Sequence, residues 1–331
     1  MFKRRLGRSN LEVSAMGLGC WAIGGPWDWL EADGSKEPDG LGQVDDAESV
    51  RAIHYALEKG INFFDTAANY GCGHSERILA NAIAGRRDKV ILATKFGYVV
   101  DEEKHTVTET EDIVSRIHQE CETSLRNLQT DYIDLYQFHV GNYPTEKAAE
   151  VRDMLETLVD EGKIRWYGWS TDNVEEARVF AQGQHCTSIQ HRLNMLGGAP
   201  QMLAVCEEHD LASINRSPFA SGILTGKFNP DTTFPNDDVR STWSLRTEQA
   251  TQLLQRIDAV RKFLADTGET RTLAQFALAW IWTHNDRTIP IPGFKTATQV
   301  RENIQAMEYG LLSKEQMKKI DEIFERPSII S

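Results

Sequence analysis

The chain has 331 residues, of which 40% are hydrophobic and 26% charged, so its composition and length are those of a globular protein with a large buried core. Its formal net charge of −13 excludes nucleic acid as an expected partner and disfavours adhesion to anionic membranes, although a small basic cluster can still hold an anionic cofactor. The five cysteines are scattered and odd in number, which indicates neither a disulfide framework nor a metal site.

The N-terminal segment begins with charged residues, but Arg8, Asn10 and Glu12 interrupt any apolar core, so it does not match a signal peptide. No run in the sequence reaches the length of about 18 apolar residues that a transmembrane helix needs. These features, together with the cysteine pattern, predict a soluble cytoplasmic protein without a membrane partner.

Short apolar runs recur along the chain, and most are followed by a segment with helical period. In chain order, the predicted strands are 16–21, 61–67, 90–96, 132–139, 164–170, 187–193, 212–219 and 287–293. The clearest amphipathic segments predict helices at 46–59, 111–128, 148–161 and 271–283. Gly60 and Gly162 are the expected C-terminal stops of the first and third of these helices. Strands that alternate with helices are typical of a parallel sheet.

Eight such units predict an α/β fold of the closed (β/α)8 TIM-barrel type, organised as one domain over residues 1–331. An open doubly wound sheet is the alternative, but the glycine-rich segment "GLGCWAIGG" lacks the G-x-G-x-x-G spacing of that fold. Segments 22–45 and 228–246 are rich in Gly, Pro and Asp, so we expect them to be long loops.

The catalytic residues of such barrels lie where the strands end, at the C-terminal face. Asp65 and Tyr70 follow the second predicted strand, Lys95 closes the third and His139 closes the fourth. Other polar residues at predicted strand ends are Ser170, Gln190, Arg216 and Ser217. We therefore expect a carboxylate, a phenol, an amine and an imidazole to converge at one face of the barrel.

These four groups suit the protonation of an alkoxide. A neighbouring ammonium stabilises phenolate and so lowers the pKa of a phenol toward the working range, and a carboxylate helps a buried lysine to keep its charge. A histidine can donate a hydrogen bond to a substrate oxygen that gains negative charge. The sequence has no serine in a G-x-S-x-G setting, so it indicates a carbonyl reduced without covalent catalysis, with the hydride supplied by a cofactor.

Two segments have the composition of a site for an anionic cofactor. In "IPIPGFKTATQVRENI" (289–304), Gly293 permits close backbone approach, Lys295 offers a cation, and Thr296 can cap a helix whose N-terminal amides attract a phosphate. In "SPFASGILTGK" (217–227), small residues allow the chain to wrap over a pyrophosphate, and Lys227 supplies positive charge.

The chain resembles the aldo-keto reductases over most of its length. The segments "FFDTAANYG", "LATKFG", "DYIDLYQFH", "SPFASGILTGK" and "IPGFKTATQVREN" occur in that family's order. The resemblance implies a (β/α)8 barrel with an N-terminal β-hairpin and long substrate-side loops, which binds NADPH without a Rossmann domain and reduces aldehydes or ketones to alcohols. The segment order is most similar to bacterial general stress and inositol dehydrogenase-like reductases and to potassium-channel β subunits.

By position, the resemblance implies that Tyr70 is the general acid, that Lys95 and Asp65 tune it, and that His139 orients the carbonyl. The cofactor-binding residues expected from the resemblance and from the two segments are Ser170, Gln190, Arg216, Ser217, Phe219, Ser221, Gly222, Lys227, Gly293, Lys295, Gln299, Glu302 and Asn303.

Two positions depart from the family pattern. Arg216 stands where many members have a tyrosine that stacks on the nicotinamide, and Thr171 stands where an asparagine is common. A planar guanidinium can also stack, but it adds a charge beside the ring. Arg216 also has a structural interpretation, as one half of an ion pair.

Taken singly, other candidates have structural interpretations as well. Asp65 can cap a turn, Lys95 can lie at the surface and His139 can be a structural histidine; their joint position at successive strand ends favours a site. Trp21 and Trp27 are predicted to line a substrate pocket, because aromatic walls suit apolar carbonyl compounds, although packing explains them equally well.

The function also has alternatives. The chain can act in reverse as an NAD(P)-dependent sugar or polyol dehydrogenase, or it can be a slow cofactor-sensing regulatory subunit. NADH is the alternative to NADPH, and a small-molecule carbonyl substrate is the expected partner. The sequence leaves the substrate and the oligomeric state open.

Overall fold

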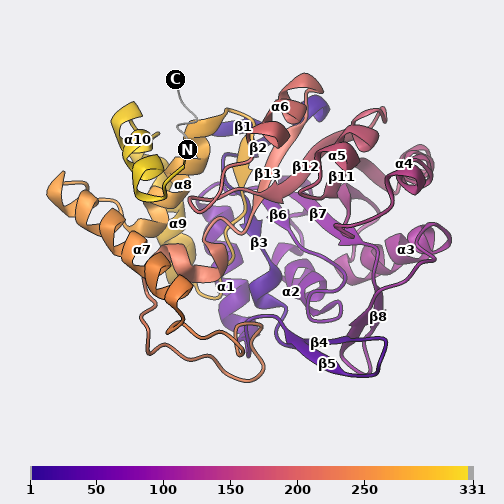
Figure 1. The fold of residues 1–331 in the computed structure, drawn as a ribbon. Coiled ribbons are helices and arrows are strands. Elements are labelled where there is room, and N and C mark those ends of the chain that lie inside the picture. The colour runs from indigo at the N-terminus through magenta and orange to yellow at the C-terminus, as the bar shows by residue number, and fades with distance from the viewer. Residues whose placement is uncertain (1, 327–331) are drawn as a thin grey trace.

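The computed structural model describes residues 2–326, and Figure 1 shows their arrangement. The predicted domain boundaries 1–331 include residue 1 and residues 327–331, which lie outside the described residues. In the described part of the chain the main sheet has eight parallel strands, each hydrogen-bonded to the next in chain order: β3 (Leu18–Gly19), β6 (Phe63–Asp65), β7 (Ile91–Phe96), β10 (Ile133–Phe138), β11 (Ile164–Ser170), β12 (Cys186–Arg192), β13 (Ala212–Arg216) and β14 (Thr288–Pro290).

This sheet closes between its first strand and the segment after its last strand. The N–H of Gly19 donates to the carbonyl oxygen of Pro292 at 3.1 Å, and Gly19 pairs with Gly293 in a parallel bridge. A Cβ atom at Gly19 would lie 2.7 Å from the backbone oxygen of Ile291, so only glycine allows this close approach. The predicted α/β barrel is confirmed.

Helices surround the barrel (Figure 1). Their bounds are α1 (Asp46–Glu58), α2 (His74–Ile83), α3 (Ile117–Leu128), α4 (Thr145–Asp160), α5 (Val174–Ala181), α6 (Pro200–Glu208), α7 (Glu248–Asp266), α8 (Leu273–His284), α9 (Ala297–Tyr309) and α10 (Lys314–Ile323). Short 3-10 helices lie at η1 (Gly7–Ser9), η2 (Trp21–Ile23), η3 (Arg87–Lys89), η4 (Val114–Arg116) and η5 (Ala220–Thr225).

The predicted stops hold, because Gly60 and Gly162 follow α1 and α4 closely with φ of 84° and 74°, values that favour glycine. The helix predicted at 111–128 begins only at Ile117, after the 3-10 turn η4.

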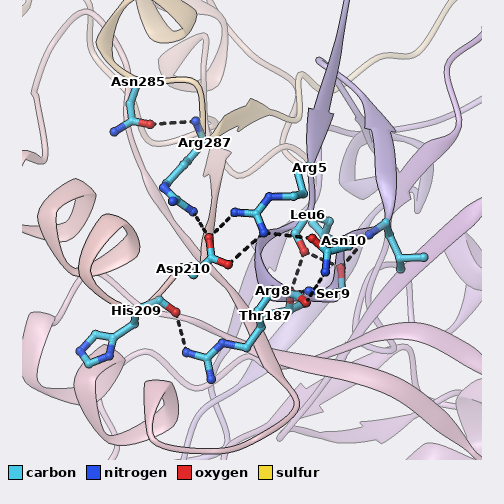
Figure 2. A network of polar contacts seen from close by, with 11 residues as sticks. Arg5, Leu6, Arg8, Ser9, Asn10, Thr187, His209, Asp210, Asn285 and Arg287 are labelled. Atoms are coloured by element: carbon cyan, nitrogen blue, oxygen red, sulfur yellow. Dashed lines mark hydrogen bonds and ion pairs between the residues drawn. The ribbon is translucent and has the colours of Figure 1, made fainter.

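An antiparallel hairpin of β1 (Lys3–Arg5) and β2 (Glu12–Ser14) lies at the N-terminal end of the barrel, as expected. Figure 2 shows how it is fixed there. Arg5 and Arg287 both donate to the carboxylate of Asp210, with Arg287 Nη1 2.6 Å from Oδ1. Thr187 Oγ1 donates to the Leu6 carbonyl at 2.6 Å. Residues at the N-terminal ends of the three neighbouring strands β12, β13 and β14 therefore hold the hairpin in one orientation.

The hairpin and the turn between its strands also fill the barrel interior at its N-terminal end. Leu6 and Val13 are fully buried and pack against Phe63, Leu135 and Ile214, which point inward from three strands. This apolar plug fills the barrel interior at its N-terminal end, opposite the end where the strands terminate.

The prediction for residues 22–45 as a plain loop is wrong. The segment contains η2 and a hairpin of β4 (Trp27–Leu30) and β5 (Lys36–Asp39). This hairpin joins β8 (Val99–Asp101) and β9 (Thr106–Thr108) in a second sheet of order β5-β4-β9-β8, which Figure 1 shows at the end of the barrel opposite the β1–β2 hairpin. By contrast, residues 228–246 contain no helix or strand, as expected.

Candidate active site

A cavity of about 630 Å³ opens at the C-terminal end of the barrel strands. Barrel residues form its floor, and the β4–β5 hairpin and the segment after β13 form its sides. Of the predicted site residues, the structure places these in its wall: Trp21, Trp27, Asp65, Tyr70, His139, Gln190, Arg216, Ser217, Phe219, Ser221, Gly222, Lys227, Gly293, Lys295, Gln299, Glu302 and Asn303. Lys95 is hydrogen-bonded to the wall residues Asp65 and Tyr70, and Ser170 lies beside the wall residue Gln190 in the strand register.

Lys95 is the central cation of the site and is fully buried near the end of β7. Its ammonium donates to Asp65 Oδ1 at 2.5 Å, to the Thr66 carbonyl at 2.8 Å and to the Tyr70 hydroxyl oxygen at 3.1 Å. Burial alone would lower the pKa of Lys95, but the charges and hydrogen bonds of Asp65 and Tyr70 outweigh burial and raise it. The amine therefore stays protonated, and all three of its N–H groups are used in these hydrogen bonds.

Asp65 ends β6 and is 2% exposed. While Oδ1 faces Lys95, Oδ2 accepts from the side-chain amides of Gln137 and Gln190, each at 2.8 Å. The two amides and the ammonium together satisfy this buried carboxylate. Gln190, predicted to bind the cofactor, thus also holds the carboxylate in place.

Tyr70 follows β6 and faces the cavity. We expected Lys95 to lower the pKa of this phenol, but burial outweighs the attraction of the ammonium, so the pKa of Tyr70 is raised above its ordinary value of 10.0. The expected direction is wrong for the protein without cofactor. The phenol is therefore protonated at neutral pH, and because its oxygen accepts from Lys95, its own proton is available for a group in the cavity.

His139 follows β10 and packs edge-on against Tyr70, with the ring centroids 5.7 Å apart. Burial and the charges of Lys95 and Arg216 lower the pKa of His139 well below 6.5, so the ring is neutral. Its Nδ1 atom lies 3.1 Å from Asn69 Oδ1. A neutral ring donates from Nε2 to a carbonyl only when Asn69 turns its amide N–H toward Nδ1, so Asn69 governs which nitrogen carries the proton.

An aromatic wall borders the cavity on the side of the second sheet, where Trp21, Trp27, Trp29 and Tyr98 line it. Trp27 and Trp29 lie with ring centroids 5.2 Å apart, and Trp29 meets Tyr98 edge-on at 4.9 Å. Asp39 lies among these rings, at the end of β5. This side of the cavity is therefore mainly aromatic and carries one carboxylate.

The segment after β13 wraps the opposite side of the cavity. Ser217 has a φ of 53°, and Ala220, Ser221 and Gly222 have φ of 46°, 53° and 96°. Such left-handed conformations cost about 1–3 kcal/mol each for residues other than glycine and persist mainly at functional sites. Successive backbone N–H groups in turns of this kind form anion-binding concavities.

Two cations face this segment. Arg240 donates to the Ser221 carbonyl at 3.1 Å and forms an ion pair with Asp238 at 2.6 Å. Burial and the charge of Arg240 lower the pKa of Lys227, which lines the same part of the cavity. The wrapped segment and these side chains suit a pyrophosphate.

The far end of the cavity lies at the N-terminus of α9. Lys295 donates to the carbonyls of Leu41 and Gln43, the latter at 3.0 Å, and burial lowers its pKa against the opposing charge of Asp238. Gln299 forms a capping box with Thr296, and its Oε1 atom accepts a hydrogen bond from the backbone N–H of Lys295 at 2.7 Å. Gln299 therefore already has a structural role at this helix end.

Asn303 provides a test of whether this end fits a nucleotide. Its side chain is 3% exposed and lines the cavity, yet its Nδ2 atom finds no acceptor among the described residues. A buried donor without a partner is costly unless a ligand satisfies it. The ring nitrogens of an adenine are acceptors of the required kind, so the residues present fit an adenine nucleotide.

Two predicted residues have other partners. Arg216 lines the cavity but also forms an ion pair with Asp172 at 2.6 Å, which is the structural alternative considered for it. Ser170 is buried at the end of β11, opposite Gln190 in the strand register. Thr171, at the second departure from the family pattern, donates from its hydroxyl to Glu176.

Sequence reasoning missed several residues of the site. Gln137 lies inside the buried strand β10, and a polar residue within the apolar run "IDLYQF" is the signal that could have found it. Asn69 directly precedes Tyr70, where proximity was the available signal. Asp39 and Tyr98 had no signal in the sequence, because they reach the cavity only through the pairing of the second sheet.

Over residues 2–326, no cluster of His, Cys, Asp and Glu has the arrangement of a metal site. Within the same range, no helix is long and apolar enough to cross a membrane.

A closed (β/α)8 barrel with a lysine–tyrosine–aspartate cluster and a groove that fits an adenine nucleotide at its C-terminal face is the arrangement expected of an oxidoreductase that uses a nicotinamide cofactor. The model of the aldo/keto reductase family matches residues 15–325. The chain belongs to this family and is an aldo-keto reductase, an enzyme of carbonyl reduction.

The chain is similar to the aldo-keto reductase YhdN of Bacillus subtilis (strain 168), with 32% identity over 96% of this chain and 92% of that protein. It is also similar to the NADH-specific methylglyoxal reductase of Escherichia coli (strain K12), with 29% identity over 98% of this chain and 100% of that protein.

Among solved structures, the glycerol dehydrogenase AKR11B4 from Gluconobacter oxydans superimposes with a TM-score of 0.82 and 31% identity, covering 99% of each chain. An aldo-keto reductase from Klebsiella pneumoniae in complex with NADPH gives a TM-score of 0.69 with 25% identity, covering 99% of this chain and 97% of the other.

Proposed function

We propose that this protein reduces aldehydes or ketones to alcohols with NADPH, and that Tyr70 is the general acid. The observation that carries the proposal is the use of Lys95: its three N–H groups go to Asp65, Thr66 and the Tyr70 oxygen, so the phenol accepts from the ammonium and keeps its own proton for the cavity. No other phenol among the described residues has a lysine ammonium as hydrogen-bond donor.

The nicotinamide, when bound, supplies the hydride. Tyr70 then donates its proton to the oxygen of the reduced carbonyl, and the adjacent Lys95 ammonium stabilises the phenolate that remains. Asp65 keeps the ammonium in place. His139 donates from Nε2 to the same carbonyl oxygen and orients it. This role requires that Asn69 turn its amide N–H, rather than the Oδ1 that lies 3.1 Å from Nδ1, toward the ring.

The preference for NADPH is supported by the charges around the groove. Lys295, Lys227 and Arg240 line it, and a lysine at the start of α9 suits the 2′-phosphate, which NADH lacks. The Klebsiella pneumoniae protein is in complex with NADPH, whereas the Escherichia coli relative is NADH-specific. NADH is therefore the alternative that an experiment must exclude.

A second candidate is oxidation of a polyol or sugar with the oxidised cofactor. It is supported by the similarity to a glycerol dehydrogenase and by the carboxylate of Asp39 in the substrate side of the cavity. A cofactor-sensing regulatory subunit is the third candidate, and the relatives named above do not include a channel subunit. One domain over the whole chain and a cytoplasmic location remain predictions.

The proposal is tested by following NADPH consumption at 340 nm with a panel of aldehydes and ketones. Wild type should turn over, and Tyr70→Phe should lose about 10²–10⁴-fold in rate, the usual contribution of a general acid. NADPH binding, measured by fluorescence titration, should stay the same. Tyr143→Phe, which removes a phenol outside the cavity, is the matched control. Full activity of Tyr70→Phe would disprove the assignment of the proton donor.

A further inference from the structure

Asp39 is a carboxylate in the substrate side of the cavity that the proposed mechanism does not use. It lies at the end of β5, directly opposite Trp27 on β4 in the antiparallel register. Both residues line the cavity that contains Tyr70 and His139. The β4–β5 hairpin therefore brings a charged group to the place where the non-reacting part of a substrate must lie.

The hydrogen bonds of Asp39 hold it in one orientation. Oδ2 accepts from the indole N–H of Trp29 at 2.9 Å, and Oδ1 accepts from the backbone N–H of Gly40 at 2.5 Å. The Trp21 side chain donates a third hydrogen bond to Asp39. Each carboxylate oxygen can accept two hydrogen bonds, so one of the four acceptor positions is left. The side chain is partly exposed to the cavity, and this position is available to a ligand there.

The surroundings favour a neutral donor over a charged one. Burial raises the pKa of Asp39, while hydrogen bonds from Gly40, Trp29 and Trp21 stabilise its ionised form. A substrate carboxylate would be repelled by ionised Asp39, and a substrate ammonium would lose much of its hydration free energy among the surrounding aromatic rings. A hydroxyl group has a small desolvation free energy compared with a charged group. It can donate a charge-assisted hydrogen bond to the carboxylate.

The rings around Asp39 complete such a site. Trp27, Trp29 and Tyr98 pack against one another at tilted or edge-on angles, and they form a rigid apolar surface beside the carboxylate. An apolar wall with one fixed acceptor suits a chain of carbon atoms that carries hydroxyl groups.

We propose that Asp39 makes the site selective for hydroxylated carbonyl compounds, by accepting a hydrogen bond from a substrate hydroxyl group. This rests on the proposed function, because it concerns the substrate of the same site. Asp39 acts on substrate choice and takes no part in proton transfer.

The test compares two aldehydes of equal carbon number that differ in hydroxyl groups, glyceraldehyde and propionaldehyde, with NADPH and with NADH as cofactor. Wild type should prefer glyceraldehyde in kcat/KM. Asp39→Asn should lower that preference about tenfold, the usual loss for a hydrogen bond to a charged group, while kcat/KM for propionaldehyde changes less than about threefold. Asp39→Leu, which removes both acceptors, should lower the preference further.

Glu37→Gln is the matched control, because it makes the same chemical change on the same strand at an exposed position outside the cavity. It should keep the wild-type preference. Equal loss with both aldehydes in Asp39→Asn shows a structural role and overturns the proposal, as does a wild type without preference. If wild type reduces neither aldehyde nor any other carbonyl compound with either cofactor, the proposed function fails and this inference with it.

Discussion

Removal of Lys95 is the perturbation whose effect on stability follows most directly from the structure. The Lys95 side chain is 0% exposed and that of its partner Asp65 is 2% exposed. In Lys95→Met, the carboxylate keeps the two glutamine amides but loses its counter-ion. Breaking a buried ion pair on one side costs about 3–5 kcal/mol, so we expect a loss of this size in the free energy of unfolding.

The double variant makes the prediction specific. Asp65→Asn alone keeps an amide oxygen beside the Lys95 ammonium but leaves this buried cation without a counter-ion, and it should also cost about 3–5 kcal/mol. Combining the two changes removes both charges. The double variant should therefore lose less than the sum of the single variants, by up to about 3 kcal/mol.

The assay is urea unfolding followed by tryptophan fluorescence for wild type, the two single variants and the double variant. Lys319→Met is the control, because Lys319 forms an ion pair with Glu322 in which both side chains are about half exposed, and it should cost less than about 1 kcal/mol. Additive losses, or a Lys95→Met variant as stable as the control, would refute the reasoning that the pair is a single buried unit.

Three further predictions concern the reaction, the cofactor and the barrel. The pKa of Tyr70 is raised above 10.0 and that of His139 is well below 6.5, so both groups are neutral between about pH 7 and 9. The kcat for reduction should therefore be flat in this range and fall at higher pH, as Tyr70 loses its proton. A fall in kcat with its midpoint near pH 8 would contradict this. Lys295→Met should weaken NADPH binding about tenfold or more and NADH binding less than about threefold in fluorescence titrations, and equal losses would exclude a 2′-phosphate contact. Gly19→Ala should lower stability in urea by more than about 1 kcal/mol, because its Cβ meets backbone at 2.7 Å, whereas Gly141→Ala, with open space around it, should not; equal stability would mean that the barrel closure adapts easily.

The barrel and the central cluster were predictable because their signals are local. Each barrel strand is an apolar run followed by a helical pattern, and Asp65, Lys95 and His139 come directly at or after strand ends, which a parallel barrel gathers at one face. The structure brings these side chains and Tyr70 together, while their roles remain proposals.

The second sheet was not predictable from the same signals. Its strands are three or four residues long, and β4 pairs with β9, about 80 residues further along the chain. Neither composition nor periodicity encodes such a distant pairing. Asp39, which depends on this sheet for its position, was missed for the same reason.

The pKa of Tyr70 shows a different limit. The sequence indicates which charge stands beside the phenol, but the direction of the shift depends on how deeply both groups are buried. Residue types at strand ends do not fix that depth, so only the packed structure sets the balance between burial and attraction.

Transfer of deuterium from NADPH that carries deuterium at both C4 positions of the nicotinamide tests the central claim most directly. Wild-type protein is mixed with the labelled cofactor and an aldehyde, and the alcohol product is analysed by mass spectrometry and NMR. We predict one deuterium on the former carbonyl carbon, formed over many turnovers at a rate on the order of 1–10 per second. If labelled NADPH binds but no deuterium reaches any carbonyl compound offered, the protein is not a carbonyl reductase in this sense, and a cofactor-sensing role becomes the better account.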